Sequence, residues 1–402
     1  MRCLLPAWCY VSRRKGGNAM KAYHFDGEEK IPSPALIYYP EIIAENTRKC
    51  IALAGGAQYL WPHVKSHKME QVLKMQISMG IRRFKCATIK EAAVAAAAGA
   101  DHILLAYPLV GPNQDRFLEL IKQWPDRTFY AVGDDLKQIK MLAGKAKEQG
   151  LIIRLFIDVN TGMNRTGVSF EDLPEFCRQL RSISSVELVG FHCYDGERHE
   201  YDPEMRKKKV EETIGAVQKL CSETEREGWE PALVMGGSPS FPCYSQEMKG
   251  TRIYYSPGTI FIYDAGYGNQ FPDLPFKPGA AVLTRVVSHP ADGYFTIDCG
   301  YKAVSAEQKY PGLLPEAVHA EPAFQSEEHW TFKMQKGYEN ERPEIGRCMY
   351  VMPWHICPTT ALYDQVFTAA GGKLSGTWRV SARGRLWETD TKEQNDAGAN
   401  GV

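Results

Sequence analysis

The chain has 402 residues, of which 44% are hydrophobic and 24% charged, with 48 basic and 48 acidic side chains. The formal net charge of zero gives no electrostatic case for nucleic acid or an anionic membrane surface as a partner, so we expect small molecules. Eleven cysteines, an odd number in a long chain without a secretory signal, indicate reduced thiols in a cytoplasmic protein. No apolar run approaches the roughly 18 residues of a membrane span.

The two ends of the chain are predicted to be extensions. The basic residues Arg13, Arg14 and Lys15 follow the first apolar stretch, which is the wrong order for a signal peptide. We therefore expect residues 1–20 to be a disordered extension, with Met20 as an alternative start of the protein. The polar residues 391–402 are expected to form a frayed tail.

From residue 35, apolar segments alternate with amphipathic or alanine-rich segments, which is the pattern of a parallel sheet with crossover helices. The predicted strands are 59–64, 83–86, 102–106, 128–132, 152–158, 186–193, 232–236 and 253–262, the last interrupted by Pro257 and Gly258. The predicted helices between them are 90–99, 114–124, 135–150, 170–182 and 202–228. This order predicts an α/β fold, a (β/α)8 TIM-like barrel over residues 34–270, with the active site at the carboxyl ends of the strands.

After about residue 270 the pattern changes to prolines and short strands. The predicted strands are 281–288, 294–298, 329–335 and 348–353. They predict a second, mostly β domain made of residues 21–33 and 271–390.

The first predicted strand ends in a cluster of two histidines and two lysines, Pro62-His63-Val64-Lys65-Ser66-His67-Lys68. A lysine at the carboxyl end of a barrel strand lies where such barrels place their chemistry. Lysine forms a Schiff base with an aldehyde such as pyridoxal phosphate once burial or a neighbouring cation lowers its pKa. A basic, solvated turn at the start of a helix explains the same residues without chemistry.

Further polar groups follow the later strands. Arg165 lies in the loop Asp158 to Gly167, and Tyr194 follows the sixth strand. Gly236-Gly237-Ser238-Pro239-Ser240 follows the seventh strand, where barrels commonly bind phosphate, and Gly258 with Thr259 offers more amide donors. Each loop alone is most simply a turn, but together with a strand-end lysine they indicate a phosphate-bearing aldehyde cofactor.

The mostly β domain contains Pro353-Trp354-His355-Ile356-Cys357-Pro358. On an extended segment, residues i and i+2 point to the same side, so His355 and Cys357 could bind one ion. A thiolate with an imidazole favours zinc, and two protein ligands leave positions open for water or a substrate oxygen. A buried thiol beside a structural histidine is the simpler explanation of the pair taken alone.

The lysine segment, the Thr161-to-Gly167 loop, Ser326-Glu327-Glu328-His329 and His355-Ile356-Cys357-Pro358-Thr359 occur here in one chain. In this combination the sequence resembles the D-threonine aldolase and D-serine dehydratase family, fold-type III pyridoxal phosphate enzymes related to alanine racemase. The similarity covers roughly residues 30 to 385. It implies a racemase-type barrel, a β domain, bound pyridoxal phosphate, a divalent metal (zinc or manganese) and a homodimer.

The resemblance also implies roles for single residues. Lys65 matches the cofactor lysine and a catalytic residue, and Arg165 matches the arginine that contacts the phenolic oxygen of the cofactor. Tyr194 matches an active-site tyrosine, and His199 stands near the place of a catalytic histidine, with a spacing about one residue shorter. Phosphate contacts are implied for Ser238, Gly258 and Thr259, and metal ligation for His355 and Cys357.

Several departures keep alternatives open. Racemases of this fold carry an arginine opposite the pyridine nitrogen where this chain has Ser256, which disfavours racemisation. His-x-Cys is the pair associated with the dehydratases, whereas Tyr194-Asp195-Gly196 followed by a histidine favours the aldolases. We therefore expect a lyase for D-β-hydroxy amino acids of the D-threonine aldolase type, with a D-serine or D-3-hydroxyaspartate dehydratase as the alternative. A second hypothesis, from a different functional class, is a protein that binds pyridoxal phosphate without catalysing a reaction.

Overall fold

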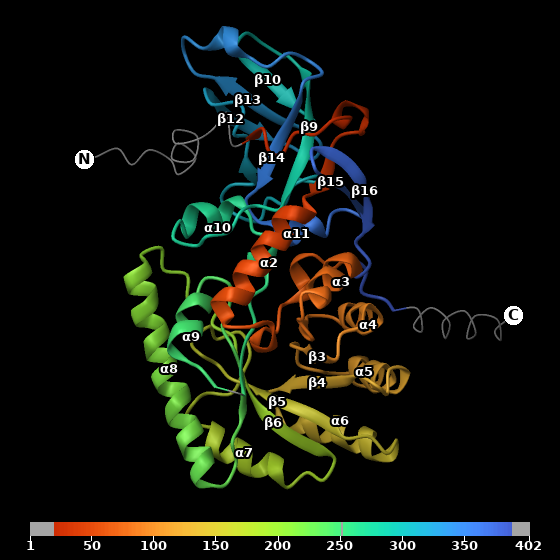
Figure 1. The fold of residues 1–402 in the computed structure, drawn as a ribbon, viewed down its shortest axis with the longest axis vertical. Helices are drawn as coiled ribbons and strands as arrows, with labels where there is room; N and C mark the ends of the chain where they lie inside the picture. The colour runs from red at the N-terminus through yellow and green to blue at the C-terminus, as the bar shows by residue number, and fades with distance from the viewer. Residues whose placement is uncertain (1–19, 251, 388–402) are drawn as a thin grey trace, which may run out of the picture. The chain divides into compact units, whose positions relative to one another are not determined.

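The computed structural model describes residues 20–250 and 252–387 (Figure 1). These residues fall into two compact units: unit 1 is made of residues 20–47 and 259–383, and unit 2 of residues 48–258 and 384–387. Among the described residues, no helix combines the length and the apolar character that crossing a membrane requires. None of the described cysteines forms a disulfide.

Unit 2 is built on a parallel sheet whose strands follow one another in chain order from β2 to β8. Its strands are β2 (Arg83–Cys86), β3 (His102–Leu105), β4 (Thr128–Gly133), β5 (Ile153–Asp158), β6 (Val186–Cys193), β7 (Ala232–Met235) and β8 (Ile253–Tyr255). Helices follow most of these strands and cover the outside of the sheet (Figure 1). Such an order of parallel strands with crossover helices is that of a TIM-like barrel.

The segment 60–63 closes this sheet between β8 and β2. Leu60 bridges Tyr255 and His63 bridges Lys85, both in parallel orientation. The carbonyl of Pro62 accepts a 2.8 Å hydrogen bond from the Lys85 amide. The predicted strand 59–64 is therefore present only as two isolated bridges, because Pro62 has no N–H to donate and the chain turns at Val64.

The helices of unit 2 begin and end at residues that favour such boundaries. The Thr88 hydroxyl accepts from the Glu91 amide at the start of α4, and Gly99 ends that helix in the left-handed conformation. Asp202 caps α8 in the same way, with Pro203 as the next residue. These helices are α3 (Glu70–Ser78), α4 (Ile89–Ala98), α5 (Pro112–Gln123), α6 (Leu136–Glu148), α7 (Leu173–Arg181), α8 (Pro203–Arg226) and α9 (Phe241–Glu247), with short 3-10 turns η2 (Ala57–Tyr59) and η3 (Val64–Ser66).

The interior of the barrel is filled by a cluster of buried side chains around Trp61. Leu104, Val132, Phe156 and Val234 each come from a different strand and belong to this cluster. The indole N–H of Trp61 donates a 2.7 Å hydrogen bond to the Phe84 carbonyl, which satisfies its buried polar atom. The barrel is thus a packed core, and polar chemistry is left to the strand ends.

Unit 1 is built on a nine-stranded sheet with the order β12-β13-β10-β9-β1-β15-β16, to which β14 adds through β9 and β11 through β14. Its strands are β1 (Ala35–Tyr38), β9 (Ala280–Ser288), β10 (Tyr294–Ile297), β11 (Gly312–Leu313), β12 (Ala320–Gln325), β13 (Trp330–Met334), β14 (Cys348–Pro353), β15 (Gln365–Ala370) and β16 (Lys373–Arg379). β1 is antiparallel to β9 and parallel to β15. An early segment of the chain therefore completes a sheet made of late segments.

The helices of unit 1 are short. They are α10 (Ala265–Gln270), α11 (Ile356–Thr360) and the 3-10 turns η1 (Glu28–Lys30), η4 (Thr259–Phe261) and η5 (Glu339–Glu341). α2 (Pro40–Ala54) joins the two units along the chain. The core of unit 1 is a buried cluster that includes Tyr39, Leu283 and Tyr350.

The predicted fold class, a TIM-like α/β barrel of the alanine racemase type with a mostly β second domain, is confirmed. The pattern did not predict the strands β1, β11, β12, β15 and β16, nor the helices α2 and α9. The two units of the structure meet in the sequence after residues 47 and 258. The predicted domains, 34–270 and 21–33 plus 271–390, have different limits and remain predictions. The predicted extension 1–20 and tail 391–402 lie outside the described residues, except for Met20.

Candidate functional site

Lys65 lies in η3, directly after the segment that closes the barrel, and its side chain is half-buried. The Nδ1 atom of His63 accepts from the Lys65 amide at 3.3 Å, and the Nδ1 atom of His67 accepts from the Met69 amide at 3.1 Å. Burial and the charge of Lys65 hold the pKa of His63 well below its usual value, and burial lowers the pKa of His67 to about 3. Both histidines are therefore neutral acceptors that shape the turn.

Lys68 anchors the same turn from its other end. It adopts a left-handed backbone with φ 58°, and its Nζ forms an ion pair with the fully buried Glu91. The second carboxylate oxygen of Glu91 accepts from the Ala87 amide at 2.7 Å. Of the two lysines of this cluster, Lys68 is therefore paired with a buried carboxylate, whereas Lys65 is the one predicted to bind the cofactor.

The ring of Tyr194, after β6, is surrounded by three cationic groups. Lys65 Nζ lies 5.5 Å, Lys85 Nζ 5.3 Å and Arg165 Cζ 4.9 Å from the ring centroid. The face of a tyrosine ring attracts cations through its quadrupole. The structure thus brings together three residues that the sequence singled out, Lys65, Arg165 and Tyr194, and adds Lys85.

The loop that carries Arg165 is held by hydrogen bonds from its backbone amides to side-chain oxygens. The Asn160 side-chain oxygen accepts from the amides of Gly162 and Asn164, both at 3.1 Å. Gly167 has φ +106°, and a Cβ there would lie 2.5 Å from the Asn160 nitrogen, so only glycine fits. The Gly167 amide donates to the Asp134 carboxylate at 2.8 Å.

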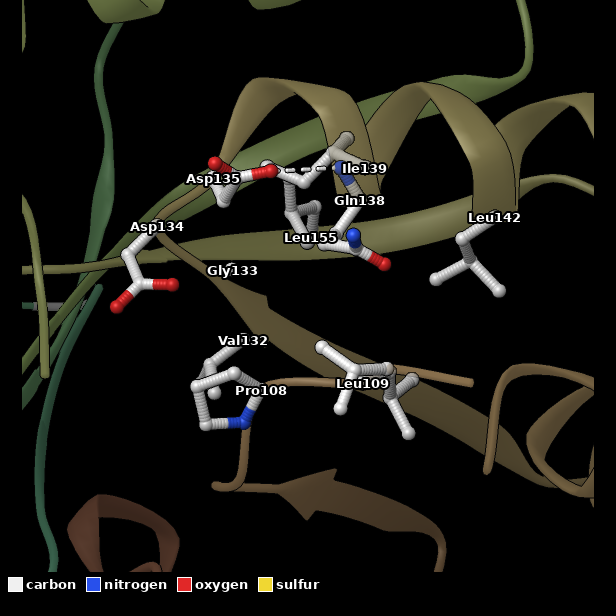
Figure 2. Close-up of a pocket in the computed structure, with 11 residues that line it drawn as sticks. Pro108, Leu109, Val132, Gly133, Asp134, Asp135, Gln138, Ile139, Leu142 and Leu155 are labelled. Atoms are coloured by element: carbon white, nitrogen blue, oxygen red, sulfur yellow. Dashed lines mark hydrogen bonds between the residues drawn. The ribbon is translucent and has the colours of Figure 1, made fainter. Parts of the chain in front are cut away.

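Asp134 belongs to a pocket at the end of β4 and the start of α6 (Figure 2). Figure 2 shows Asp134 and Asp135 at one side of the pocket and apolar side chains such as Pro108, Leu109 and Leu142 on the others. None of the predicted site residues lines it. The Asp134 carboxylate at the edge of this pocket is the group that accepts from Gly167 in the loop that carries Arg165.

Ser238 and Gly258, two of the predicted phosphate contacts, lie against each other. The Gly258 amide donates to Ser238 Oγ at 3.2 Å. A Cβ at Gly258 would lie 3.1 Å from His63 Cβ and 3.3 Å from Ser66 Oγ, so glycine lets this turn approach the lysine turn. Asp195 Oδ1 accepts from the Gly237 amide at 2.8 Å and from Ser240 Oγ at 2.9 Å, which fixes the loop.

These groups fit pyridoxal phosphate. Lys65 offers a primary amine for the aldehyde, and Ser238 with the glycine turns offers a hydroxyl and close backbone approach for the phosphate. The positive charges of Lys65, Lys85 and Arg165 gather around one ring, which favours an anionic ligand.

In unit 1, His355 and Cys357 occupy the start of a helix, so the prediction of an extended segment is wrong. His355 is the N-cap of α11, and Cys357 lies in its first turn. The reason is Asp264, whose Oδ2 accepts from the Ile356 amide at 3.1 Å and whose Oδ1 accepts from the Tyr267 amide at 2.9 Å. This buried carboxylate, whose pKa burial raises to about 6, ties the starts of α10 and α11 together.

The two side chains nevertheless contact each other. Burial lowers the pKa of His355, but the hydrogen bond and the charge of the Cys357 side chain outweigh burial and raise it to about 9. His355 Nδ1 lies 2.5 Å from Glu307 Oε1, and Cys357 Sγ lies 3.2 Å from Thr259 Oγ1. Thr259, predicted as a phosphate contact, therefore contacts the cysteine.

The donor set of this turn fits a metal ion with open positions. An imidazole whose Nδ1 is held by a carboxylate keeps Nε2 for a metal, and a thiolate adds a second donor suited to zinc. In the described part of the chain, no three His, Cys, Asp or Glu side chains form a metal-binding group. Two protein ligands would leave the other positions to water or substrate.

His199 is not among the residues around Tyr194. Its side chain is exposed, and its amide donates to the Glu197 carbonyl at 3.1 Å. Lys85, conversely, was missed by the sequence interpretation, although a charged residue between Phe84 and Cys86 in a buried strand was a usable signal.

The fold, a racemase-type barrel with a β domain, agrees with comparisons to known proteins. The model of the alanine racemase N-terminal domain matches residues 40–257, and the model of a putative serine dehydratase domain matches residues 279–369. The chain therefore belongs to the family of the alanine racemase N-terminal domain.

The relatives include aldolases and a dehydratase. A D-threonine aldolase from Arthrobacter sp. is 25% identical, with 88% of this chain and 93% of the relative covered. A 3-hydroxy-D-aspartate aldolase from Paracoccus denitrificans (strain Pd 1222) is 26% identical, with 89% and 94% covered, and a D-threo-3-hydroxyaspartate dehydratase from Delftia sp. (strain HT23) is 26% identical, with 79% and 89% covered. The solved D-threonine aldolase from Filomicrobium marinum has TM-score 0.80 and 24% identity, with 89% and 98% covered. The predicted resemblance and enzyme class, a pyridoxal phosphate lyase, are confirmed at family level.

Proposed function

We propose that this protein is a pyridoxal phosphate- and divalent-metal-dependent lyase that acts on D-β-hydroxy amino acids, of the D-threonine aldolase type. The observation that carries the proposal is the gathering of Lys65, Arg165 and Lys85 around Tyr194, beside the Ser238–Gly258 contact. The aldolases among the relatives support the reaction class. The His355–Cys357 turn supports the metal.

The cofactor-binding roles fall to residues of unit 2. Lys65 Nζ is the amine that attaches the cofactor aldehyde, and Arg165 supplies a fixed positive charge for its phenolic oxygen. Ser238 Oγ and the turn at Gly258 receive the phosphate. Pyridoxal phosphate, when bound, supplies an electron-accepting ring for the bond broken at Cα of the substrate.

The metal-binding roles fall to residues of unit 1. His355 Nε2 and Cys357 Sγ hold the ion, and the Glu307 carboxylate orients the imidazole. A zinc or manganese ion there supplies a Lewis acid for the β-hydroxyl of the substrate. His199 is assigned the base for the β-hydroxyl proton on its position after β6, and its exposure leaves it accessible to solvent.

The alternative is a dehydratase for D-serine or D-3-hydroxyaspartate. The observation in its favour is the thiol of Cys357 as the second metal donor, together with the dehydratase among the relatives. In that branch Lys65 Nζ takes the α-proton instead of anchoring the cofactor alone. The two branches differ in which proton a residue of this chain removes.

Products distinguish the two branches. Purified protein, loaded with pyridoxal phosphate and zinc or manganese, is incubated with D-threonine, D-serine and D-3-hydroxyaspartate, with L-threonine as the stereochemical control. Glycine with an aldehyde is the expected outcome. A 2-oxo acid with ammonia and no glycine would reject the aldolase branch, and no turnover by a loaded, folded protein would favour a non-catalytic binding protein.

We further infer a homodimer and a cytoplasmic location from the family alone. Sedimentation at several protein concentrations tests the dimer. A monomer throughout would reject it.

A further inference from the structure

Asp195, directly after Tyr194, is a buried carboxyl group that the proposed reaction does not use. Only 1% of its surface is exposed. The chain turns tightly here, because a Cβ at Gly196 would lie 2.5 Å from Tyr194 Cε1. The partners of Asp195 at hydrogen-bond distance, the Gly237 amide and the Ser240 hydroxyl, are both neutral. A carboxylate buried against neutral donors is costly, and such a group tends to bind a proton instead.

Both donors to Asp195 act on the same oxygen. Oδ1 accepts from the Gly237 amide at 2.8 Å and from Ser240 Oγ at 2.9 Å. The single proton of the Ser240 hydroxyl goes to Oδ1, since the other acceptor within reach, the Gly237 carbonyl, lies farther away at 3.4 Å. Oδ2 is buried and makes no hydrogen bond within the part of the chain that the structure describes. A proton on Oδ2 therefore leaves both hydrogen bonds to Oδ1 in place.

The titratable groups that face Asp195 come from several elements. Glu197, on the same loop, adds a like charge, and Tyr244 presents a phenol from α9. Cys193 ends β6 as a further buried acid, and Lys85, on β2, is a cation whose charge acts on Asp195. Burial is the largest effect and, with the charge of Glu197, outweighs the hydrogen bonds and raises the pKa of Asp195 to about 6. The free protein is thus close to binding a proton at this site.

The proposed phosphate site adjoins this carboxyl group. Ser238 directly follows Gly237, whose amide Asp195 holds, and Ser238 Oγ accepts from the Gly258 amide at 3.2 Å. A Cβ at Gly237 would lie 3.6 Å from Asp195 Oδ1, so the loop and the carboxyl group are in close contact. A phosphate monoester carries about 1.5 to 2 negative charges at pH 7. Such a like charge, brought into a buried site, raises the pKa of a carboxyl group further.

We propose that Asp195 is a positioning residue whose carboxyl group takes up a proton when the cofactor phosphate binds. The proposal rests on the proposed function, namely on phosphate binding at Ser238 and Gly258. The proton comes from solvent and resides on Oδ2, while Oδ1 continues to hold the Gly237 amide and the Ser240 hydroxyl. Cofactor affinity therefore falls as the pH rises above about 6, because the free protein is then ionised and must acquire this proton on binding.

Asp195→Asn makes the neutral form permanent, because its amide oxygen still accepts from Gly237 and Ser240 but the group cannot ionise. The test compares the full-length wild-type protein with this variant after removal of the cofactor from both. The probe is deoxypyridoxine phosphate, which has the phosphate but no aldehyde, so the Lys65 amine forms no Schiff base with it. Calorimetric titration in buffers of different ionisation enthalpy measures both the affinity and the number of protons taken up.

At pH 7.5 the wild-type protein is expected to take up about one proton more than Asp195→Asn, and at pH 5 this difference is expected to vanish. Between pH 6 and pH 8 the Kd of the wild type, relative to that of Asp195→Asn, is expected to rise by up to about tenfold per pH unit. Asp126→Asn, at an exposed carboxylate before β4, is the matched control and should behave as the wild type. Pyridoxal, which lacks the phosphate, should show no difference in proton uptake between wild type and Asp195→Asn.

Each outcome bears on one proposal. Equal proton uptake by the wild type and folded Asp195→Asn at pH 7.5, or weaker binding by Asp195→Asn at every pH, overturns the role of Asp195. A wild-type protein that gives no Schiff-base absorbance with pyridoxal phosphate rejects the proposed function instead. If Asp195→Asn does not fold, the infrared difference spectrum of the wild type with 13C-labelled aspartate decides. The band of a protonated carboxyl group is expected to appear on binding at pH 7.5, and its absence overturns the proposal.

Discussion

The imidazole Nδ1 of His355 lies 2.5 Å from the carboxylate oxygen Oε1 of Glu307. A carboxylate that holds one nitrogen of a histidine fixes the tautomer and the orientation of the ring, so that the other nitrogen is presented to a metal. Both side chains are partly exposed, at 37% and 42%, so an ion could reach them from solvent.

Glu307→Gln is expected to weaken zinc binding by about 10- to 100-fold, the usual effect of losing such a partner. Competition with a chromophoric chelator measures the affinity, and thermal unfolding of the metal-free protein checks the fold. Glu344→Gln, at an exposed carboxylate elsewhere in unit 1, is the matched control. An affinity of Glu307→Gln equal to that of the control would show that Glu307 has no part in metal binding.

Lys65→Ala is expected to lose the visible absorbance of a lysine–cofactor Schiff base, because no other amine is proposed to attach the aldehyde. Lys74→Ala, four residues into α3, keeps this absorbance. An absorption spectrum after removal of free cofactor by gel filtration is the measurement. Persistence of the band in Lys65→Ala would remove Lys65 from this role and point to Lys85.

Gly190→Ala is expected to destabilise unit 2 by about 1–3 kcal/mol or more, as overpacking does. A Cβ at this position of β6 would lie 1.8 Å from the Ala232 carbonyl oxygen of the paired strand β7. Gly215→Ala, in α8 with open space around it, is the control and is expected to be neutral or stabilising by up to about 1 kcal/mol. Urea unfolding followed by circular dichroism compares them. Equal midpoints would show that the strands move apart freely.

His24 predicts a pH dependence of stability in unit 1. Its hydrogen bonds to Glu28 and Glu316 raise its pKa to about 10 in spite of burial. Because the folded pKa lies above the unfolded one, this contribution is fully present below about pH 6.5 and is lost as the pH rises to 10. The ring is 34% exposed, so solvent screening reduces the effect to on the order of 1 kcal/mol.

His24→Gln should therefore lose stability relative to the wild type at pH 6 but match it near pH 10. Chemical unfolding at pH 6, 8 and 10 measures the difference. A constant difference across this range would mean that the contacts of His24 matter and its charge does not.

The sequence predicted most of the barrel because its strands are short apolar segments between clear helix boundaries. The β2 to β8 segments each lie within two residues of their predicted starts. β1 and α2 were missed, since Ala35–Tyr38 pairs only with strands about 245 and 330 residues later, at β9 and β15, and local pattern carries no information on such partners.

Site residues were predicted where a loop or turn signal marked them. Lys65, Arg165 and Tyr194 follow predicted strands, and the structure places the cations of Lys65 and Arg165 over the ring of Tyr194. The helical start at His355 could not be predicted, because its cause is the Asp264 carboxylate, 92 residues away. Lys85 was missed since its buried contacts are with Ser256, directly after β8, and His192, on β6, which are far from it in the sequence.

The short segment 60–63 closes the barrel through the Leu60 and His63 bridges, and Lys65 follows it within two residues. The same short segment therefore closes the barrel and positions the Lys65 amine. If this segment detached from the sheet, the protein would keep most of its helices, but Lys65 would no longer be positioned to bind the cofactor aldehyde. With increasing denaturant, the cofactor absorbance of the loaded protein should then decrease before its helical circular-dichroism signal does. The cofactor would thus report a local opening of the barrel that circular dichroism does not detect.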